Sequence, residues 1–375
     1  MRVRAVILAV ALVLPLNAQA EILVGFVGPL TGEMELAGEQ MGNGAKLAAD
    51  ELNAAGGVLG QKLILNLIDD HCDAEQALAA ARKLVADRVM VAIGHVCSGT
   101  AIPASLIYEA ARIPLLTLAA NPLLTDRGLR YTFRVSPADD TNARFTATHI
   151  VRQLGAKRVT IVHDTRVYGR GLADLMRSSL EEHGTPAVLF EATEPGQLVF
   201  TDLIERARRA ESDALYYGGY PREIGLLRRQ MAETGFLPPT ILSGAGSSQE
   251  YVMIAGPAAE GTLVVADRPF ETVELSQFAA RLREANLGEA DLRSTRGYSS
   301  VRLWAQAVEA AGTTDGTAVA QALHSGTFHV LGVEARFDAE GNAQGPLGEA
   351  ALWVWRTGRA VPLESDFSSS SKDAP

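Results

Sequence analysis

The chain has 375 residues, enough for two domains of ordinary size, and its 47% hydrophobic and 21% charged residues are typical of a globular protein with ample material for a core. Its 34 Lys and Arg residues against 44 Asp and Glu give a net charge of −10. This acidic balance argues against a general binder of nucleic acids or of anionic membranes, and we expect neither as a partner.

The N-terminal segment, residues 1–20, has the three parts of a secretory signal. Arg2 and Arg4 are basic, an apolar run of about a dozen residues follows, and Ala18-Gln19-Ala20 is a small-x-small cleavage pattern. The apolar run is short for a membrane span, which disfavours the alternative of an uncleaved anchor. We therefore expect a signal peptide, cleavage before Glu21 and a mature protein in the periplasm.

After this segment, apolar runs alternate with amphipathic stretches. The continuous apolar run at residues 22–27 predicts a strand buried on both faces, and the apolar spacing from Leu36 to Leu52 predicts a helix that ends at Gly56-Gly57. The same rhythm predicts strands at residues 63–68, from about 91, and at 114–117, with helices at 74–86 and 101–111. Such alternation indicates βαβ units and a parallel sheet.

A second unit repeats this architecture. After an extended run at residues 131–135, Ser136-Pro137-Ala138-Asp139 looks like a crossover. We then expect helices at residues 142–154, 169–183, 200–209 and 223–234, and strands at 158–163, 187–191, 214–217, 240–242 and 263–265. We expect a second crossover at Asp267-Arg268-Pro269, then helices at 275–285, 299–311 and 317–324 and a strand at 351–355. We expect the Ser-rich tail, residues 364–375, to be disordered.

The chain contains two cysteines, Cys72 and Cys97. Because export places the protein in an oxidising compartment, we expect one disulfide between them, which would close a loop of 25 residues and stabilise the fold by roughly 3 kcal/mol. His71 and His95 lie beside the cysteines, so a zinc site is the alternative, but the spacing is not that of a zinc finger or ribbon. We expect no metal.

Catalytic motifs are missing from the sequence. It has no G-x-S-x-G, H-E-x-x-H or Walker A pattern, and no G-x-G-x-x-G follows a predicted strand. His163 and Asp164 are neighbours, but no nucleophile is tied to them by any pattern. We therefore expect neither an enzyme nor a cofactor.

Small polar loops at the ends of the predicted strands suggest a ligand site instead. In parallel α/β sheets, ligands bind at the carboxyl ends of the strands. Ser98 follows one strand and Asn121 the next, while Tyr168 and Tyr220 follow strands of the second unit. Hydroxyls and free N–H groups suit a carboxylate, and aromatic walls suit a side chain. The alternatives are a helix-capping role for Ser98 and ordinary half-buried tyrosines.

The sequence resembles the periplasmic leucine/isoleucine/valine-binding proteins, the substrate-binding components of branched-chain amino-acid ABC importers. The resemblance extends from Glu21 to about Arg356. The motifs that carry it are Gly28-Pro29-Leu30-Thr31-Gly32, Ala54-Ala55-Gly56-Gly57-Val58-Leu59-Gly60, Asp69-Asp70-His71-Cys72-Asp73, Gly94-His95-Val96-Cys97-Ser98, Ile161-Val162-His163-Asp164, Tyr168-Gly169-Arg170-Gly171-Leu172 and Tyr216-Tyr217-Gly218-Gly219-Tyr220.

The resemblance implies an α/β, type I periplasmic-binding-protein fold with two Rossmann-like lobes, a ligand cleft and three hinge crossovers near Pro137, Asp267 and Gly345. Lobe 1 would comprise residues 21–137 and 268–345, and lobe 2 residues 138–267 and 346–363. The resemblance also implies that the disulfide lies next to the site. The ligand-binding positions would be Ser98, Ala119, Ala120, Asn121, Tyr168, Tyr220 and Ala245.

Three positions depart from the family pattern. Asn121 stands where the family typically has a threonine, Ala245 lies near the place of a glutamate for the ligand ammonium, and a tyrosine common near Ala37 is missing. Either another acid substitutes for the glutamate or the ligand is not an ordinary α-amino acid. Arg293 and Arg296 lie close to a stretch that approaches the ligand in the family, and we expect them to be surface charges rather than a site for a second carboxylate.

These observations predict an exported, monomeric solute-binding protein that delivers a branched-chain amino acid or similar ligand to the membrane subunits of an ABC permease. One alternative is the same fold binding a non-amino-acid carboxylate or an amide. Another is a ligand sensor without a permease partner.

Overall fold

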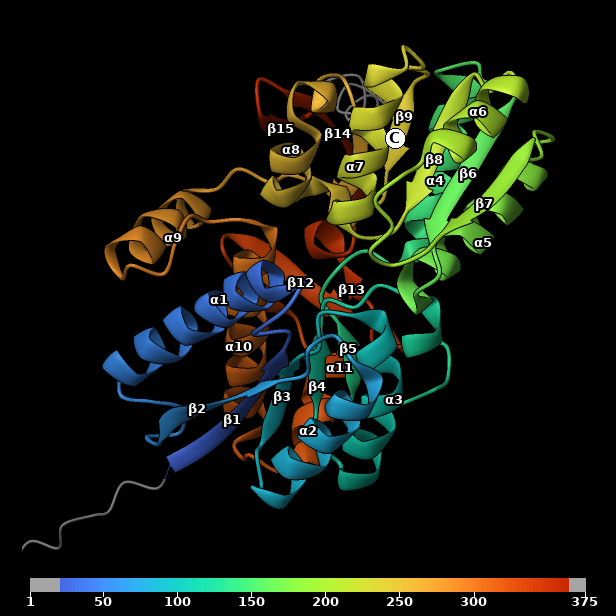
Figure 1. The fold of residues 1–375 in the computed structure, drawn as a ribbon. Coiled ribbons are helices and arrows are strands. Elements are labelled where there is room, and N and C mark those ends of the chain that lie inside the picture. Colours follow the sequence, from blue (N-terminus) through green and yellow to red (C-terminus); the bar gives the residue numbers. More distant parts are fainter. Residues whose placement is uncertain (1–20, 364–375) are drawn as a thin grey trace, which may run out of the picture.

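The computed structural model describes residues 21–363, so the expected signal peptide (1–20) and tail (364–375) lie outside the described residues. Two lobes, each a β-sheet with helices on both faces, lie one above the other (Figure 1). A small three-stranded sheet adds to the lower lobe. The predicted α/β fold is confirmed.

Lobe 1 is built on five parallel strands in the order β2-β1-β3-β4-β5. They are β1 (Glu21–Gly28), β2 (Lys62–Asp69), β3 (Val91–Gly94), β4 (Leu115–Thr117) and β5 (Thr132–Arg134). Helices α1 (Glu35–Ala54) and α10 (Leu292–Ala311) cover one face, and α2 (Ala74–Ala86) and α3 (Ser98–Ala111) cover the other. All five strands point their carboxyl ends toward the second lobe (Figure 1), where a ligand site is expected.

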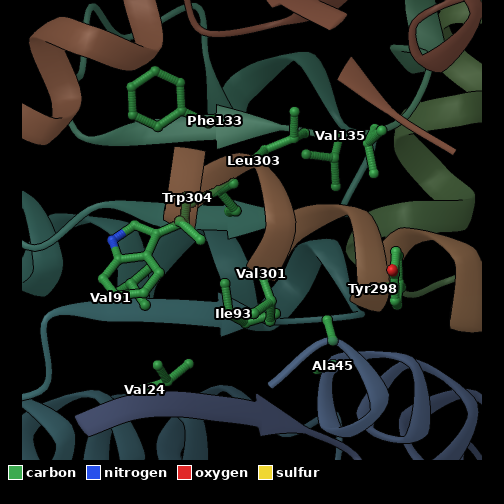
Figure 2. Packing of buried hydrophobic residues seen from close by; sticks show 14 of the residues in the cluster. Val24, Ala45, Val91, Ile93, Phe133, Val135, Tyr298, Val301, Leu303 and Trp304 are labelled. Carbon is green, nitrogen blue, oxygen red and sulfur yellow. The ribbon is translucent and has the colours of Figure 1, made fainter. Parts of the chain in front are cut away.

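Glycines bring helices α1 and α10 unusually close. A Cβ at Gly44 of α1 would lie 1.8 Å from the carbonyl oxygen of Ser294, and one at Gly297 of α10 would lie 1.9 Å from that of Met41. Further along α10, Val301 and Trp304 are fully buried in the same core cluster as Val91 and Ile93 of β3 (Figure 2). This contact fixes the start of α10, which faces the second lobe.

Lobe 2 is built on seven strands in the order β15-β14-β10-β9-β8-β6-β7. They are β6 (Val159–Asp164), β7 (Leu189–Thr193), β8 (Ala214–Gly218), β9 (Thr240–Leu242), β10 (Leu263–Asp267), β14 (Ala350–Arg356) and β15 (Arg359–Pro362). The first five run parallel, and β14 and β15 are antiparallel to their neighbours. Helices α4 (Asp139–Arg152) and α5 (Val167–Glu182) cover one face, and α6 (Thr201–Arg209), α7 (Pro221–Glu233) and α8 (Gln249–Ala255) the other.

The chain passes between the two large sheets three times, after β5, after β10 and after the small sheet. The second passage leads to α9 (Val273–Glu284), α10 and α11 (Gly316–Ser325), and then to the small sheet of β11 (Phe328–Val330), β12 (Val333–Phe337) and β13 (Ala343–Gln344). Across residues 21–363, no helix combines the length and apolar character that a membrane crossing requires.

Several elements differ from the sequence-based expectation. The small sheet, β15 and α8 were not predicted, and α10 begins seven residues earlier than the expected residue 299. The early start has a local cause, a capping box in which the Asp291 carboxylate accepts from the Ser294 N–H while the Ser294 hydroxyl interacts with the Asp291 backbone. Arg293 and Arg296 therefore lie in the first two turns of a helix.

Candidate functional site

A cavity of about 760 Å³, including the part open to solvent, lies between the lobes. Five of the seven predicted positions line it, namely Ser98, Ala120, Tyr168, Tyr220 and Ala245. The other lining residues are Met34, Val96, Leu118, Ser136, Pro137, Asp139, Asn142, Gly244, Ser247, Val265, Ala266, Asp267, Leu292, Arg293 and Arg296.

Ser98 is the first residue of helix α3 and lines the cavity. Its side chain is buried, and its Oγ has no hydrogen-bond partner among the residues that the structure describes. The first N–H groups of a helix also lack partners within the helix, and together with the helix dipole they favour an anion. The Ser98 hydroxyl and the first N–H groups of α3 are therefore suited to bind the carboxylate of a ligand.

A disulfide joins Cys72 to Cys97, the residue before Ser98, with a Cα–Cα distance of 5.7 Å. It ties the turn after β2 to the start of α3, as predicted. The two histidines of the alternative zinc site have other partners. The His95 Nδ1 lies 2.6 Å from the buried Asp70 carboxylate, and the His71 Nδ1 lies 2.7 Å from the Thr31 hydroxyl.

Ala119 and Asn121 are not brought into the cavity wall. The Ala119 N–H donates to the Thr117 hydroxyl at 3.0 Å, and its side chain packs in a small apolar cluster behind the wall. The Asn121 carboxamide oxygen accepts from the Leu123 N–H at 3.0 Å, which caps the short helix η1 (Pro122–Leu124). The Asn121 amide nitrogen lies against Gly171 of lobe 2. Asn121 therefore contributes to a contact between the lobes rather than to the lining.

Two acceptors that sequence reasoning missed lie in the cavity, Asp139 and Asn142 of helix α4. Oδ2 of Asp139 and Oδ1 of Asn142 are buried, and neither has a hydrogen-bond partner within residues 21–363. Burial raises the pKa of Asp139 to about 7, although the nearby Arg134 guanidinium lowers it in part. Both residues lie one turn apart on one helix face and suit a hydrogen-bond donor, above all a cation.

Tyr168 and Tyr220 form an aromatic wall from lobe 2. Their ring centroids are 5.2 Å apart with an interplanar angle of 35°. Burial raises the pKa of both phenols, so they remain neutral hydrogen-bonding groups at physiological pH. Ala245 lies beside Tyr168 in the short helix η2 (Gly244–Ser247), and its methyl group supplies no charge.

Arg293 and Arg296 are not the surface charges that we expected. Both line the cavity, and Arg296 is only 2% exposed. The Arg296 Nε donates to Asp267 Oδ2 at 2.7 Å and Nη2 contacts the same oxygen, so this ion pair joins α10 of lobe 1 to the end of β10 in lobe 2. The prediction was wrong because α10 begins before both arginines and its close packing on α1 turns them inward.

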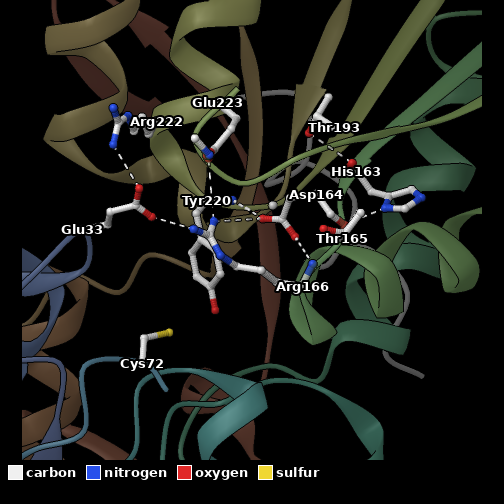
Figure 3. Close-up of polar contacts among 12 residues, drawn as sticks. Glu33, Cys72, His163, Asp164, Thr165, Arg166, Thr193, Tyr220, Arg222 and Glu223 are labelled. Atoms are coloured by element: carbon white, nitrogen blue, oxygen red, sulfur yellow. Dashed lines mark hydrogen bonds and ion pairs between the residues drawn. The ribbon is translucent and has the colours of Figure 1, made fainter. Parts of the chain in front are cut away.

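Beside the cavity, Glu33 of lobe 1 bridges two arginines of lobe 2 (Figure 3). Its carboxylate oxygens lie 2.5 Å from Arg166 Nη2 and 3.0 Å from Arg222 Nη1. The Arg166 guanidinium also lies over the Tyr220 ring, 5.3 Å from its centroid. Arg166 thus contacts both a residue of the cavity wall and the carboxylate of the other lobe.

Two α/β lobes joined by three crossovers, with a cavity lined from both sides, define a class of proteins that bind small molecules between lobes. The model of the family described as "Periplasmic binding protein" matches residues 21–356. The Leu/Ile/Val-binding protein homolog 1 of Brucella melitensis is 35% identical over 346 residues, which cover 91% of this chain and 92% of the relative. The Leu/Ile/Val-binding protein BraC3 of Rhizobium johnstonii is 36% identical, with 92% and 95% covered.

A solved structure agrees with these relatives. The ABC transporter substrate-binding protein from Desulfitobacterium hafniense in complex with Leu is 27% identical, covers 92% of this chain and 100% of its own, and superposes with a TM-score of 0.76. The chain belongs to the periplasmic binding protein family and is a solute-binding protein with the type I fold. This family serves substrate binding in transport and is not a family of enzymes.

Proposed function

We propose that the protein captures an α-amino acid, or a closely similar ligand, between its lobes and delivers it to the membrane subunits of an ABC permease. The single observation that carries the proposal is that one cavity contains two groups of buried polar atoms without hydrogen-bond partners among the described residues. The Ser98 hydroxyl at the start of α3 suits a carboxylate, and Asp139 with Asn142 suits an ammonium group. A zwitterion supplies both.

In this proposal Asp139 takes the place of the glutamate that the chain lacks near Ala245. The Ala120 carbonyl accepts from the Asp139 N–H at 2.9 Å, which places lobe 1 and the start of α4 side by side around the ligand head group. Tyr168 and Tyr220 cover the ligand from lobe 2. Ala119 and Asn121 support this arrangement from behind the wall.

The names of the relatives, Leu/Ile/Val-binding proteins, support an amino acid as the ligand and ABC transport as the process. We propose export through the N-terminal signal, a periplasmic location and action as a monomer. The proposed lobes are residues 21–137 with 268–345 and residues 138–267 with 346–363, which move about the three crossovers as the ligand is enclosed.

Alanine substitutions at Ser98 and Tyr220 test the site. Each should weaken amino-acid binding at least tenfold, or about 1.4 kcal/mol, because each removes a direct contact with the buried ligand. Isothermal titration calorimetry of the mature protein measures this. Ser105→Ala is the matched control, because it removes a buried hydroxyl from the same helix outside the cavity lining. Wild-type affinity in both Ser98→Ala and Tyr220→Ala would refute the proposed site.

One observation favours a second candidate ligand, a carboxylate without an amino group. Ala245 supplies no charge, and burial raises the pKa of Asp139 to about 7, so near neutral pH the protonated carboxyl group can instead donate a hydrogen bond to a ligand carboxylate. A thermal-shift screen of amino acids against carboxylates that lack the amino group separates the two candidates, since a ligand that binds the folded state raises the melting temperature.

A further inference from the structure

We propose that the side chain of the ligand ends in a carboxylate, which Arg293 and Arg296 bind at the wall that helix α10 contributes to the cavity. This inference rests on the proposed function, because it names the side chain of the amino acid that the same cavity would hold. It departs from the aliphatic ligands in the names of the relatives.

Arg296 is the strongest part of the argument. Its guanidinium is buried in the cavity wall, and two of its nitrogens contact one oxygen of Asp267. The third nitrogen, Nη1, is also buried and has no hydrogen-bond partner in the described part of the chain. A buried donor left without a partner is destabilising, and the cost is greater when the donor is charged. A ligand oxygen in the cavity would remove that cost.

Arg293 lies three residues earlier, on the same face of α10, and its side chain is 13% exposed. Its contacts are long, since Nη1 lies 3.4 Å from Gln40 Oε1 and 3.8 Å from Asp291 Oδ2. Glu250 of lobe 2 is also close enough to interact with its charge. None of these is a close bidentate pair, the arrangement in which a guanidinium binds a carboxylate most strongly.

The charge at this wall discriminates between side chains. Asp267 compensates the charge of Arg296 but leaves its Nη1 without a partner, and the carboxylate of Asp291 lies 3.8 Å from Arg293, so the wall retains hydrogen-bonding capacity for a ligand. An aliphatic side chain would displace water from these donors and offer no acceptor in return, which costs affinity. A carboxylate on a short aliphatic stem supplies the acceptor, while its methylene groups pack against Met34 and Leu292, which line the same cavity.

The experiment compares the affinities of the ligand-stripped mature protein for L-glutamate, L-aspartate, L-glutamine and L-leucine by calorimetry. We expect an acidic amino acid to bind at least tenfold more tightly than both leucine and glutamine. In Arg293→Gln, the ratio of acidic to aliphatic affinity should fall at least tenfold. Arg302→Gln is the control, because it removes a positive charge from the same helix outside the cavity lining. It should leave this ratio unchanged.

The outcomes separate the two proposals. Leucine or glutamine binding as tightly as the acidic amino acids, or an unchanged affinity ratio in Arg293→Gln, overturns the carboxylate side chain and leaves the amino-acid site intact. Binding of no amino acid overturns the proposed function and this inference together. Arg296→Lys provides a second readout if Arg293→Gln folds poorly, because a lysine retains the charge toward Asp267 but loses the guanidinium fork, and the same fall in ratio is expected.

Discussion

Asp139 combines a buried carboxyl group with a position in the cavity wall, and burial raises its pKa to about 7. A cationic ammonium group binds the ionised form, so binding must remove the proton wherever Asp139 is protonated. At pH 6, about one unit below the pKa, roughly a tenth of the molecules are ionised. We predict that amino-acid affinity falls about tenfold from pH 8 to pH 6, with proton release on binding that calorimetry in buffers of different ionisation enthalpy detects.

The substitution Asp139→Asn should weaken binding at least tenfold at pH 8 and abolish this pH dependence.

The same substitution should stabilise the ligand-free protein at pH 8, although it weakens ligand binding. The folded carboxyl holds its proton up to about pH 7 whereas the unfolded one ionises near 3.8, so its contribution to the unfolding free energy falls as the pH rises between these values. Asp139→Asn should therefore raise the melting temperature at pH 8. Asp202→Asn, at an exposed carboxylate in the first turn of α6 outside the cavity lining, is the control. An unchanged pH profile in Asp139→Asn would contradict the assignment.

Sequence reasoning identified the cavity residues that follow strands, and it missed those that follow the crossover between the lobes. Ser98, Tyr168 and Tyr220 follow strands directly, and the rule for parallel sheets was enough to predict their place in the cavity. Asp139 appeared only as the end of a crossover, because its role depends on where α4 packs after the chain changes lobe. No local pattern separates such a carboxylate from an ordinary residue of the first helical turn, where acids are common.

At the scale of elements, strongly periodic strands and helices were predictable, whereas α10 was predicted to begin too late. Its first turns contain Arg293, Ser294 and Arg296, whose polarity masks the helical pattern, and the capping box uses Ser294 rather than the more usual glutamate or glutamine. The strands β11 and β12 do alternate buried apolar with exposed polar residues, but they are only three and five residues long, so their pattern was not predicted as a sheet. The part of α10 that was not predicted is therefore its first two turns, which contribute the two arginines to the cavity.

The close approach of α1 and α10 gives a prediction for Gly297. In an exposed helix, Gly→Ala stabilises by up to about 1 kcal/mol through helix propensity. Here the new Cβ would lie 1.9 Å from the Met41 carbonyl oxygen, so α10 must shift away from α1. We expect Gly297→Ala to lower the melting temperature by several degrees and to weaken ligand binding, because the shift displaces Arg293 and Arg296.

Thermal unfolding and calorimetry measure the two effects of Gly297→Ala. Gly99→Ala in α3 is the control for stability, because its Cβ would meet nothing closer than 3.8 Å. It should be neutral or stabilising. A Gly297→Ala protein as stable as the wild type would show that the two helices do not constrain each other as the structure indicates.

For the whole molecule, the contacts between lobes decide how long a ligand stays enclosed. Three of them surround the cavity: the ion pairs of Glu33 with Arg166 and Arg222, the ion pair of Arg296 with Asp267, and the packing of Asn121 on Gly171. Those of Glu33 exist only while the lobes are together. Ligand contacts and these contacts therefore stabilise the same closed state, and each strengthens the other.

The substitution Glu33→Gln tests this coupling without touching the cavity lining. The Glu33 side chain is 41% exposed, so solvent screens its ion pairs and each contributes at most about 1 kcal/mol. We predict a two- to fivefold faster ligand dissociation at low ionic strength, measured by stopped-flow fluorescence, and a difference from wild type that disappears in high salt. Glu35→Gln, two residues later on the exposed side of α1, should dissociate as the wild type does. If Glu33→Gln retained the wild-type rate at low ionic strength, the energy of closure would have to come from the ligand and the buried contacts alone.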